Sequence, residues 1–153
     1  MEAYFRLEPE AVFVDDADGK KAILQRLAQR FASVYDLDAV IVQEALEERE
    51  ALGSTGFGRG VAIPHARIDG LGCPVVALMR LDSPVEFDAA DGMAVDLVFG
   101  LLSPSNAGVS HLHALAAISR MARDDAMHQA LTDANDAEAL FSLLSTAIDR
   151  DAA

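Results

Sequence analysis

The chain has 153 residues, 52% of them hydrophobic, and a formal net charge of −13. This length and composition exclude a disordered chain, so we expect residues 1–153 to form a single domain with a buried core. Because nucleic acids and anionic membranes are bound through Lys and Arg that neutralise phosphates, the acidic charge argues against both kinds of partner; it favours a basic protein partner, or serves solubility alone.

The first predicted elements are a short strand and a helix. Residues 11–14 are apolar and predict the strand. Over residues 20–34, apolar side chains recur at helical spacing, which predicts an amphipathic helix. Asp18 stands just before this pattern and is the predicted N-cap.

A second helix is predicted over residues 38–48, shortly before a glycine-rich loop at residues 53–60. The side chains expected to face inward from this helix are those of Ile41, Ala45 and Leu46. Two consecutive helices therefore deliver the chain to the loop.

The rest of the chain predicts three strands and then three helices. The strands are expected at residues 61–63, 75–81 and 95–102, and the last is apolar except for Asp96, as a buried central strand should be. The helices are expected at residues 110–123, 125–132 and 137–148, the first capped by Ser110 and the others by a preceding aspartate. This succession indicates an α/β fold with a sheet covered by helices on both faces.

Two segments, residues 51–68 and 97–123, contain no acidic residue. They hold three of the four histidines and several arginines, namely His65, His111, His113, Arg59, Arg67, Arg120 and Arg123. A carboxylate beside a bound phosphate would repel it and raise the pKa of a neighbouring imidazole, so these segments favour an anion site. The alternative is that buried strands and helices lack acids in any case.

The glycine-rich loop at residues 53–60 is compatible with anion binding through successive backbone N–H groups. It does not end in Gly-Lys-Ser/Thr, which excludes a Walker loop. It follows a helix and precedes a strand, which is the wrong context for a dinucleotide fingerprint. A plain structural turn remains the alternative.

The four histidines differ in their expected environments. His65 follows Pro64 at the end of the strand predicted at residues 61–63, a place where α/β proteins often carry chemistry. His111 is expected to face the protein body near a helix N-terminus, which favours an anion. His113 is expected on a solvated face, and His128 at the surface.

The sequence also bears on location. No apolar run approaches the ~20 residues of a membrane span. The first residues lack the basic and apolar regions of a secretory signal. The single cysteine, Cys73, excludes an internal disulfide and a cysteine-built zinc site. We therefore expect a cytoplasmic protein.

The stretch from Leu52 to His65, LGSTGFGRGVAIPH, closely resembles the active-site stretch of enzyme IIA domains of the bacterial phosphotransferase system, fructose/mannitol type (type 2). Further matching segments are Glu48-Arg49-Glu50, residues 84–88, residues 95–98 and Ser110-His111-Leu112. The similarity extends over about residues 11–144, and it is greatest to the stand-alone nitrogen-regulatory branch of the family.

This resemblance implies a mixed sheet between helices, hence a three-layer α/β/α fold, and a phosphocarrier that needs no cofactor and no metal. It implies that an HPr-like phosphocarrier protein is the donor, and that regulatory targets or a IIB component bind the domain. The residues whose roles it implies are His65 as the phosphorylated nucleophile, His111 and Arg49 beside it, and Ser54, Thr55 and Gly56 around the phosphate.

Other functions remain open at this stage. A sugar-type enzyme IIA would pass phosphate to a IIB component for fructose or mannitol uptake, instead of regulating nitrogen or potassium metabolism. A binding module could keep the fold and lose phosphotransfer, although His65, His111 and Arg49 are all present. A hydrolase or metal enzyme using the two histidines is the fourth possibility.

Overall fold

The computed structural model describes residues 4–152, in which six strands form one mixed sheet. The strands are β1 (Val12–Asp15), β2 (Gly56–Gly58), β3 (Val61–Ala62), β4 (His65–Ile68), β5 (Val75–Val85) and β6 (Val95–Pro104). Their order across the sheet is β1-β5-β6-β3-β2, and β4 also pairs with β6. The β5–β6 and β2–β3 pairs are antiparallel and the other pairs are parallel. The strand with the apolar run, β6, is therefore central, as predicted.

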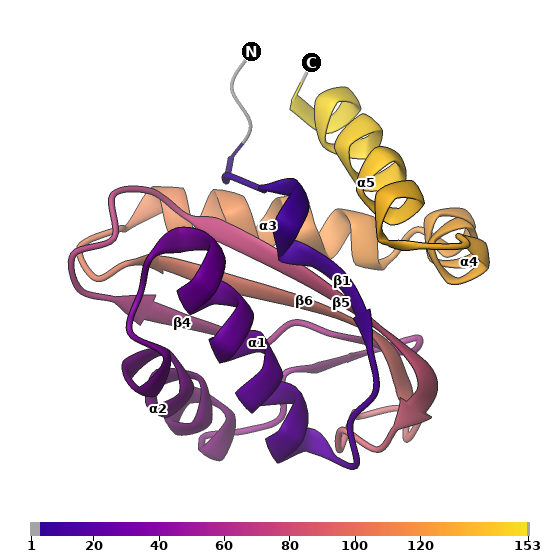
Figure 1. The fold of residues 1–153 in the computed structure, drawn as a ribbon, viewed down its shortest axis with the longest axis horizontal. Helices are drawn as coiled ribbons and strands as arrows, with labels where there is room; N and C mark the ends of the chain where they lie inside the picture. Colours follow the sequence, from indigo (N-terminus) through magenta and orange to yellow (C-terminus); the bar gives the residue numbers. More distant parts are fainter. Residues whose placement is uncertain (1–3, 153) are drawn as a thin grey trace.

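Helices cover both faces of this sheet (Figure 1). One face carries α1 (Lys20–Tyr35) and α2 (Ala39–Ala51), and the other carries α3 (Val109–Ala122), α4 (Asp125–Asp133) and α5 (Ala137–Ala152). A short 3-10 turn, η1 (Pro9–Ala11), leads into β1. The predicted three-layer α/β/α fold with a mixed central sheet is confirmed.

The sheet separates two hydrophobic cores because successive strand residues point to opposite faces. On β5, Met79 packs in the core under α1 and α2, whereas Leu78 packs in the core under α3 and α5. Gly100 on β6 lets α1 approach closely, since a Cβ atom there would stand 2.8 Å from Cε2 of the buried Phe31. Larger side chains at this point of β6 would therefore push α1 away from the sheet.

Two of the predicted helix caps are wrong. The residue that precedes α1 is Gly19, which makes no side-chain hydrogen bond, and Asp18 lies one position outside the cap. The residue that precedes α3 is Gly108, again without a side-chain bond, and Ser110 lies within the first turn. The cap position of α1 therefore lies one residue after Asp18, and that of α3 lies two residues before Ser110.

The aspartate caps predicted for α4 and α5 are confirmed, and α2 has an aspartate cap that the sequence analysis did not assign. Asp38 accepts a hydrogen bond from the backbone N–H two residues later, at 2.9 Å. Asp124 and Asp136 each accept one from the N–H three residues later, at 3.1 and 2.9 Å. A side-chain oxygen in this position satisfies a donor that the first helical turn leaves without a partner.

The buried stripe of α2 differs in part from the prediction. Leu46 is buried as expected and Ala45 is partly buried, but Ile41 is 54% exposed. The stripe runs at four-residue spacing through Val42, Leu46 and Glu50. Its last member is an acid, and this is why apolar residues alone placed the stripe one position too early.

The predicted glycine-rich loop contains a short strand of its own. β2 pairs with β3 in an antiparallel hairpin, whose turn includes Arg59 at φ 59° and Gly60 at φ 81°. Positive φ at consecutive turn residues matches the twist of a tight hairpin. The loop thus follows a helix and leads into a strand, as the sequence predicted.

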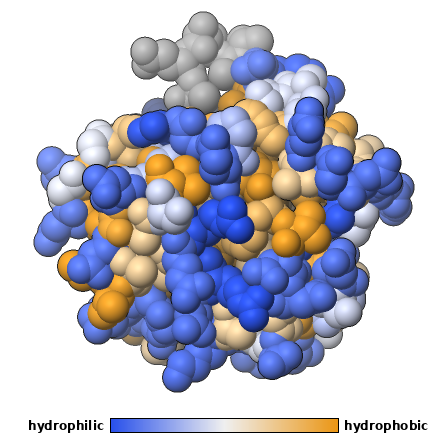
Figure 2. Space-filling view, viewed as in Figure 1, coloured by the Kyte–Doolittle hydropathy of each residue, from blue (hydrophilic) through white to orange (hydrophobic). Residues whose placement is uncertain are grey.

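The face covered by α1 and α2 is mostly hydrophilic, with apolar side chains in scattered patches (Figure 2). Exposed apolar residues on or directly after α2 are Val40, Ile41 and Leu52.

None of the helices within residues 4–152 combines the length and the apolarity that crossing a membrane requires.

Candidate functional site

A pocket of about 410 Å³ lies where α2, β4 and the start of α3 meet. Its lining consists of Ala45, Glu48, Arg49, Leu52, His65, Ala66, Arg67 and His111. The fold thus brings together three residues that the sequence singled out in separate segments, namely His65, His111 and Arg49.

His65 follows β3, as predicted, and also begins β4. Its ring is partly buried, with Nδ1 2.8 Å from the carbonyl oxygen of Ile63. Because a carbonyl oxygen only accepts, Nδ1 must carry the hydrogen, and the neutral ring keeps its lone pair on Nε2. Burial lowers the pKa of His65; the bond to Ile63 opposes this effect, and the positive charge of Arg49 lowers the pKa further. The ring is therefore neutral at neutral pH.

His111 stands in the first turn of α3 and is 7% exposed, so it faces the protein body as predicted. Its Nδ1 lies 2.7 Å from Oγ of Ser103, at the end of β6. The rings of His65 and His111 are inclined at 45°, with their centroids 5.9 Å apart. Burial lowers the pKa of His111, and the neighbouring Arg67 and His65 lower it further. Two imidazoles that favour the neutral form therefore share one pocket.

Two guanidinium groups line the same pocket. Nη1 of Arg49 donates to the carbonyl oxygen of Gly53 at 3.0 Å, and Nη1 of Arg67 donates to that of Ala107. A guanidinium has five N–H donors, so each of these single bonds leaves donors for an anion. The charge of the pocket is mixed, because Glu48 is also part of the lining.

The other arginines of the acid-free segments lie elsewhere. Arg59 donates to the carbonyl oxygen of Arg123 at 2.9 Å and forms an ion pair with Asp125 at 3.0 Å. Arg120 lines a separate hollow beside α4 and α5. Of the four arginines in those segments, the pocket therefore contains Arg67.

The three residues expected around the phosphate, Ser54, Thr55 and Gly56, are absent from the pocket lining. Oγ of Ser54 donates to the carbonyl oxygen of Phe87 at 2.6 Å and accepts from the N–H of Gly56 at 3.0 Å. Thr55 donates to the carboxylate of Glu50 through both its N–H and its hydroxyl. The hydroxyls of this loop are therefore engaged within the protein.

Sequence reasoning missed the burial of Glu50, which is 8% exposed. Its carboxylate also accepts from Nζ of Lys20 at 2.9 Å. The available signal was its position four residues after the inward Leu46, which puts both on one helix face. A polar residue on a buried face indicates a partner from another segment.

The two other histidines lie outside the pocket. His113 is exposed as predicted, and its ring packs against Tyr4 with centroids 5.5 Å apart. The prediction that His128 is a surface residue is wrong: it is partly buried, with Nε2 2.9 Å from Oδ1 of Asp96. This pairing also explains why an acid interrupts the apolar run of β6.

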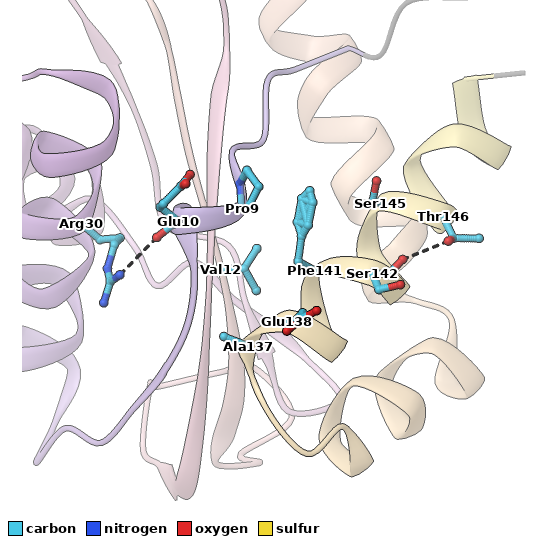
Figure 3. Close-up of a pocket in the computed structure, with 10 residues that line it drawn as sticks. All are labelled: Pro9, Glu10, Val12, Arg30, Ala137, Glu138, Phe141, Ser142, Ser145 and Thr146. Atoms are coloured by element: carbon cyan, nitrogen blue, oxygen red, sulfur yellow. Dashed lines mark hydrogen bonds between the residues drawn. The ribbon is translucent and has the colours of Figure 1, made fainter.

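A larger hollow, of about 680 Å³, lies between the η1–β1 segment and α5 (Figure 3). Pro9, Val12 and Phe141 provide its apolar surface. Arg30 at its edge donates to the carbonyl oxygen of Glu10 at 3.1 Å. The hollow thus offers an apolar surface together with hydroxyl groups from α5, and its lining includes neither His65 nor His111.

Within residues 4–152, no group of three His, Cys, Asp or Glu side chains could hold a metal ion.

Comparison with known proteins gives a consistent result. Residues 6–147 match the family model described as "Phosphoenolpyruvate-dependent sugar phosphotransferase system, EIIA 2". The nitrogen regulatory protein of Bradyrhizobium diazoefficiens is 42% identical over 138 residues, 90% of each chain. The fructose-specific EIIA component of Haloferax volcanii is 33% identical over 132 residues, 86% of this chain and 84% of that one. The crystal structure of nitrogen regulatory protein IIA-Ntr from Neisseria meningitidis superposes with a TM-score of 0.83 at 34% identity, covering 90% of this chain and 95% of that one.

Proposed function

The chain belongs to the EIIA 2 family of the phosphoenolpyruvate-dependent sugar phosphotransferase system, and on that premise we propose that it accepts a phosphoryl group on His65 from an HPr-like phosphocarrier. The observation that carries the proposal is the state of this imidazole. Nδ1 donates to the Ile63 carbonyl, so Nε2 holds a lone pair in a ring whose pKa is lowered.

In the proposed step, Nε2 of His65 attacks the phosphorus of a phosphohistidine on the donor. The new N–P bond forms as the old one breaks, and the donor imidazole leaves with its electron pair. The His65 ring gains positive charge as it binds phosphorus, and its Nδ1–H donates to the Ile63 carbonyl oxygen, which stabilises that charge. No further reactant is needed.

The phosphoryl oxygens carry negative charge in the loose transition state of such a transfer. Arg49, Arg67 and His111 line the pocket and are the groups proposed to stabilise it. The N-terminus of α3, two residues before His111, adds the positive end of the helix dipole. Ser54, Thr55 and Gly56 support the site from the neighbouring loop.

A protein donor must dock around the pocket for this transfer. Leu52 in the lining is 85% exposed, and Val109 and Leu112 on the first turn of α3 are exposed as well. Apolar side chains beside a polar centre suit a transient protein contact. The net charge of −13 favours a partner with a basic face.

The proposed output is regulatory, of the nitrogen or potassium type: phosphorylated and unphosphorylated forms would bind different target proteins. A phosphoryl group adds roughly −1.5 to −2 charges at one surface point, which is enough to switch a contact. The similarity to nitrogen regulatory proteins supports this branch. The alternative is a sugar-type enzyme IIA that passes phosphate to a IIB component, and the fructose-specific relative supports it.

The proposal further includes one domain over residues 1–153 and a cytoplasmic location. The family match over residues 6–147 and the two cores on one sheet support the first. The single cysteine, Cys73, is exposed and unpaired, which suits a reducing compartment.

The test is transfer of ³²P from phosphoenolpyruvate through the upstream carriers to three purified proteins: the wild type, His65→Ala and His113→Ala. We expect label on the wild type and on His113→Ala, whose exposed imidazole lies outside the pocket, and none on His65→Ala. Label that persists on His65→Ala would reject the proposal. A pull-down with wild type, His65→Ala and His65→Glu then identifies partners that depend on the phosphorylation state.

A further inference from the structure

A buried carboxylate that is not part of the pocket lining holds the loop that precedes His65. Glu50 ends the inward stripe of α2 and is 8% exposed. Its Oε1 accepts from the N–H of Thr55 at 2.9 Å and from Nζ of Lys20 at 2.9 Å, and its Oε2 accepts from the Thr55 hydroxyl at 2.5 Å. Removing a carboxylate from water is unfavourable unless hydrogen-bond donors replace the water. Glu50 has three such donors, two from Thr55 and one from Lys20.

Two further hydrogen bonds connect this carboxylate to the reactive imidazole. The carbonyl oxygen of Thr55 accepts from the N–H of Ile63 at 2.9 Å. The carbonyl oxygen of Ile63 accepts from Nδ1 of His65 at 2.8 Å. Ile63, whose carbonyl oxygen decides where the His65 ring carries its proton, is therefore anchored through its own N–H to Thr55. Thr55 in turn is held by Glu50.

The other side of the loop is held independently. Oγ of Ser54 donates to the carbonyl oxygen of Phe87 at 2.6 Å. Lys20 links Glu50 to the same segment, with Nζ 3.2 Å from Oδ2 of Asp88 and 4.8 Å from the centre of the Phe87 ring. The loop is thus fixed at two adjacent residues, from α2 and from the segment after β5.

We propose that Glu50 is a positioning residue for the phosphoryl transfer: through Thr55 and Ile63 it keeps the proton of His65 on Nδ1 and the lone pair on Nε2. This inference rests on the proposed function. It gives Ser54 and Thr55 a different role from the one that the family resemblance implied, since their side chains hold the loop and do not bind the phosphoryl group.

The charge of Glu50 contributes a second effect. Its negative charge favours positive charge on the His65 ring, which opposes the lowering of the pKa by burial and by Arg49. The ring becomes positively charged when Nε2 binds phosphorus. A negative charge held in the protein within electrostatic reach of the ring stabilises that product.

The test uses Glu50→Gln in the full chain, with Glu44→Gln as the matched control. Glu44 is an exposed acid on the same helix, so the control makes the same change in net charge. Long-range ¹H–¹⁵N NMR reports the tautomer and the titration of His65 without any phosphotransfer. In Glu50→Gln we expect a mixed tautomer, a lower His65 pKa, and phosphoryl acceptance slower by roughly tenfold to a hundredfold. In Glu44→Gln we expect wild-type values.

Thr55→Val provides a second variant, because it removes the hydroxyl bond to Glu50 while keeping the shape and the backbone bond. We expect the same changes as in Glu50→Gln, but smaller, and this variant decides the question if Glu50→Gln does not fold. Slower transfer with an unchanged His65 tautomer in Thr55→Val would mean that its hydroxyl binds phosphate, and would overturn the inference. A wild-type tautomer and rate in a folded Glu50→Gln would overturn it as well. If wild-type protein accepts no phosphoryl group, the proposed function fails, while the NMR result still tests the positioning.

Discussion

His65 and His128 are two partly buried histidines, each bonded through one ring nitrogen, but the bonded nitrogen and its partner differ. Nδ1 of His65 bonds a backbone carbonyl oxygen at 2.8 Å, whereas Nε2 of His128 bonds the Asp96 carboxylate at 2.9 Å. The first arrangement keeps the lone pair on Nε2, in a pocket beside a second imidazole, where we propose that it attacks phosphorus. The second uses Nε2 to connect α4 to β6.

The surroundings of His128 confirm a packing role. A Cβ atom at Gly60 would stand 2.9 Å from its Cε1, so the hairpin turn fits closely around the ring. His65 instead lines a pocket with His111 and two arginines. Both rings are partly buried, so burial does not distinguish them. What distinguishes them is the bonded ring nitrogen and the group to which it is bonded.

The largest effect on transfer is expected at His111, the second imidazole of the pocket. We expect His111→Ala to slow phosphoryl acceptance by roughly a hundredfold or more, because it removes a group placed to stabilise the transferring phosphoryl oxygens. The measurement is the rate of ³²P incorporation from a phosphorylated HPr-like donor. The control is His113→Ala, from the exposed face of the same helix. Equal rates in the two variants would contradict the assignment of His111 to the site.

The pH dependence of transfer tests the protonation state of His65. Because burial and Arg49 lower its pKa, the attacking ring is neutral until the pH falls below about 6.5, the ordinary value for histidine. We expect an acceptance rate that is level at neutral pH and falls as the pH drops below this value, by about tenfold per unit well below the pKa. The unfolded chain binds this proton more readily, so stability falls as the pH drops from about 6.5 toward the lowered pKa of the folded protein, and it levels off below that pKa. A rate that already declines between pH 8 and 7 would contradict the assignment.

The smallest effect on transfer is expected at the other histidine. His128→Ala leaves Asp96 without its partner and opens a space beside Gly60, so we expect a loss of about 1–3 kcal/mol in the free energy of unfolding. Transfer should stay within a factor of about two, because the change lies outside the pocket. Urea unfolding and ³²P incorporation measure the two quantities. A loss of transfer as large as that of His111→Ala would remove the distinction between the two histidines.

Much of the fold could be predicted because it depends on local pattern. The apolar run at β6 predicted the central strand, and the aspartates before α4 and α5 predicted caps that the structure contains. The caps predicted at Asp18 and Ser110 were wrong because a cap requires one particular backbone position. Gly19 occupies that position before α1, and Gly108 occupies it before α3.

The site could be predicted in part from the resemblance to a known family. The ordered motif ending at His65, together with Arg49 and His111, predicted residues that line one pocket. The burial of Glu50 and the pairing of His128 with Asp96 depend on partners from distant segments, which no local spacing reveals. In both cases the only sequence signal was a polar residue within an apolar pattern.

The central claim is that Nε2 of His65 is the atom that accepts the phosphoryl group. The most direct test is ³¹P–¹⁵N NMR on protein that has been ¹⁵N-labelled at histidine and phosphorylated by the upstream donor. The account predicts one phosphorus coupled to Nε2 of His65, with Nδ1 still facing the Ile63 carbonyl. A phosphoryl group on Nδ1 of His65, or on any of the other three histidines, would contradict it.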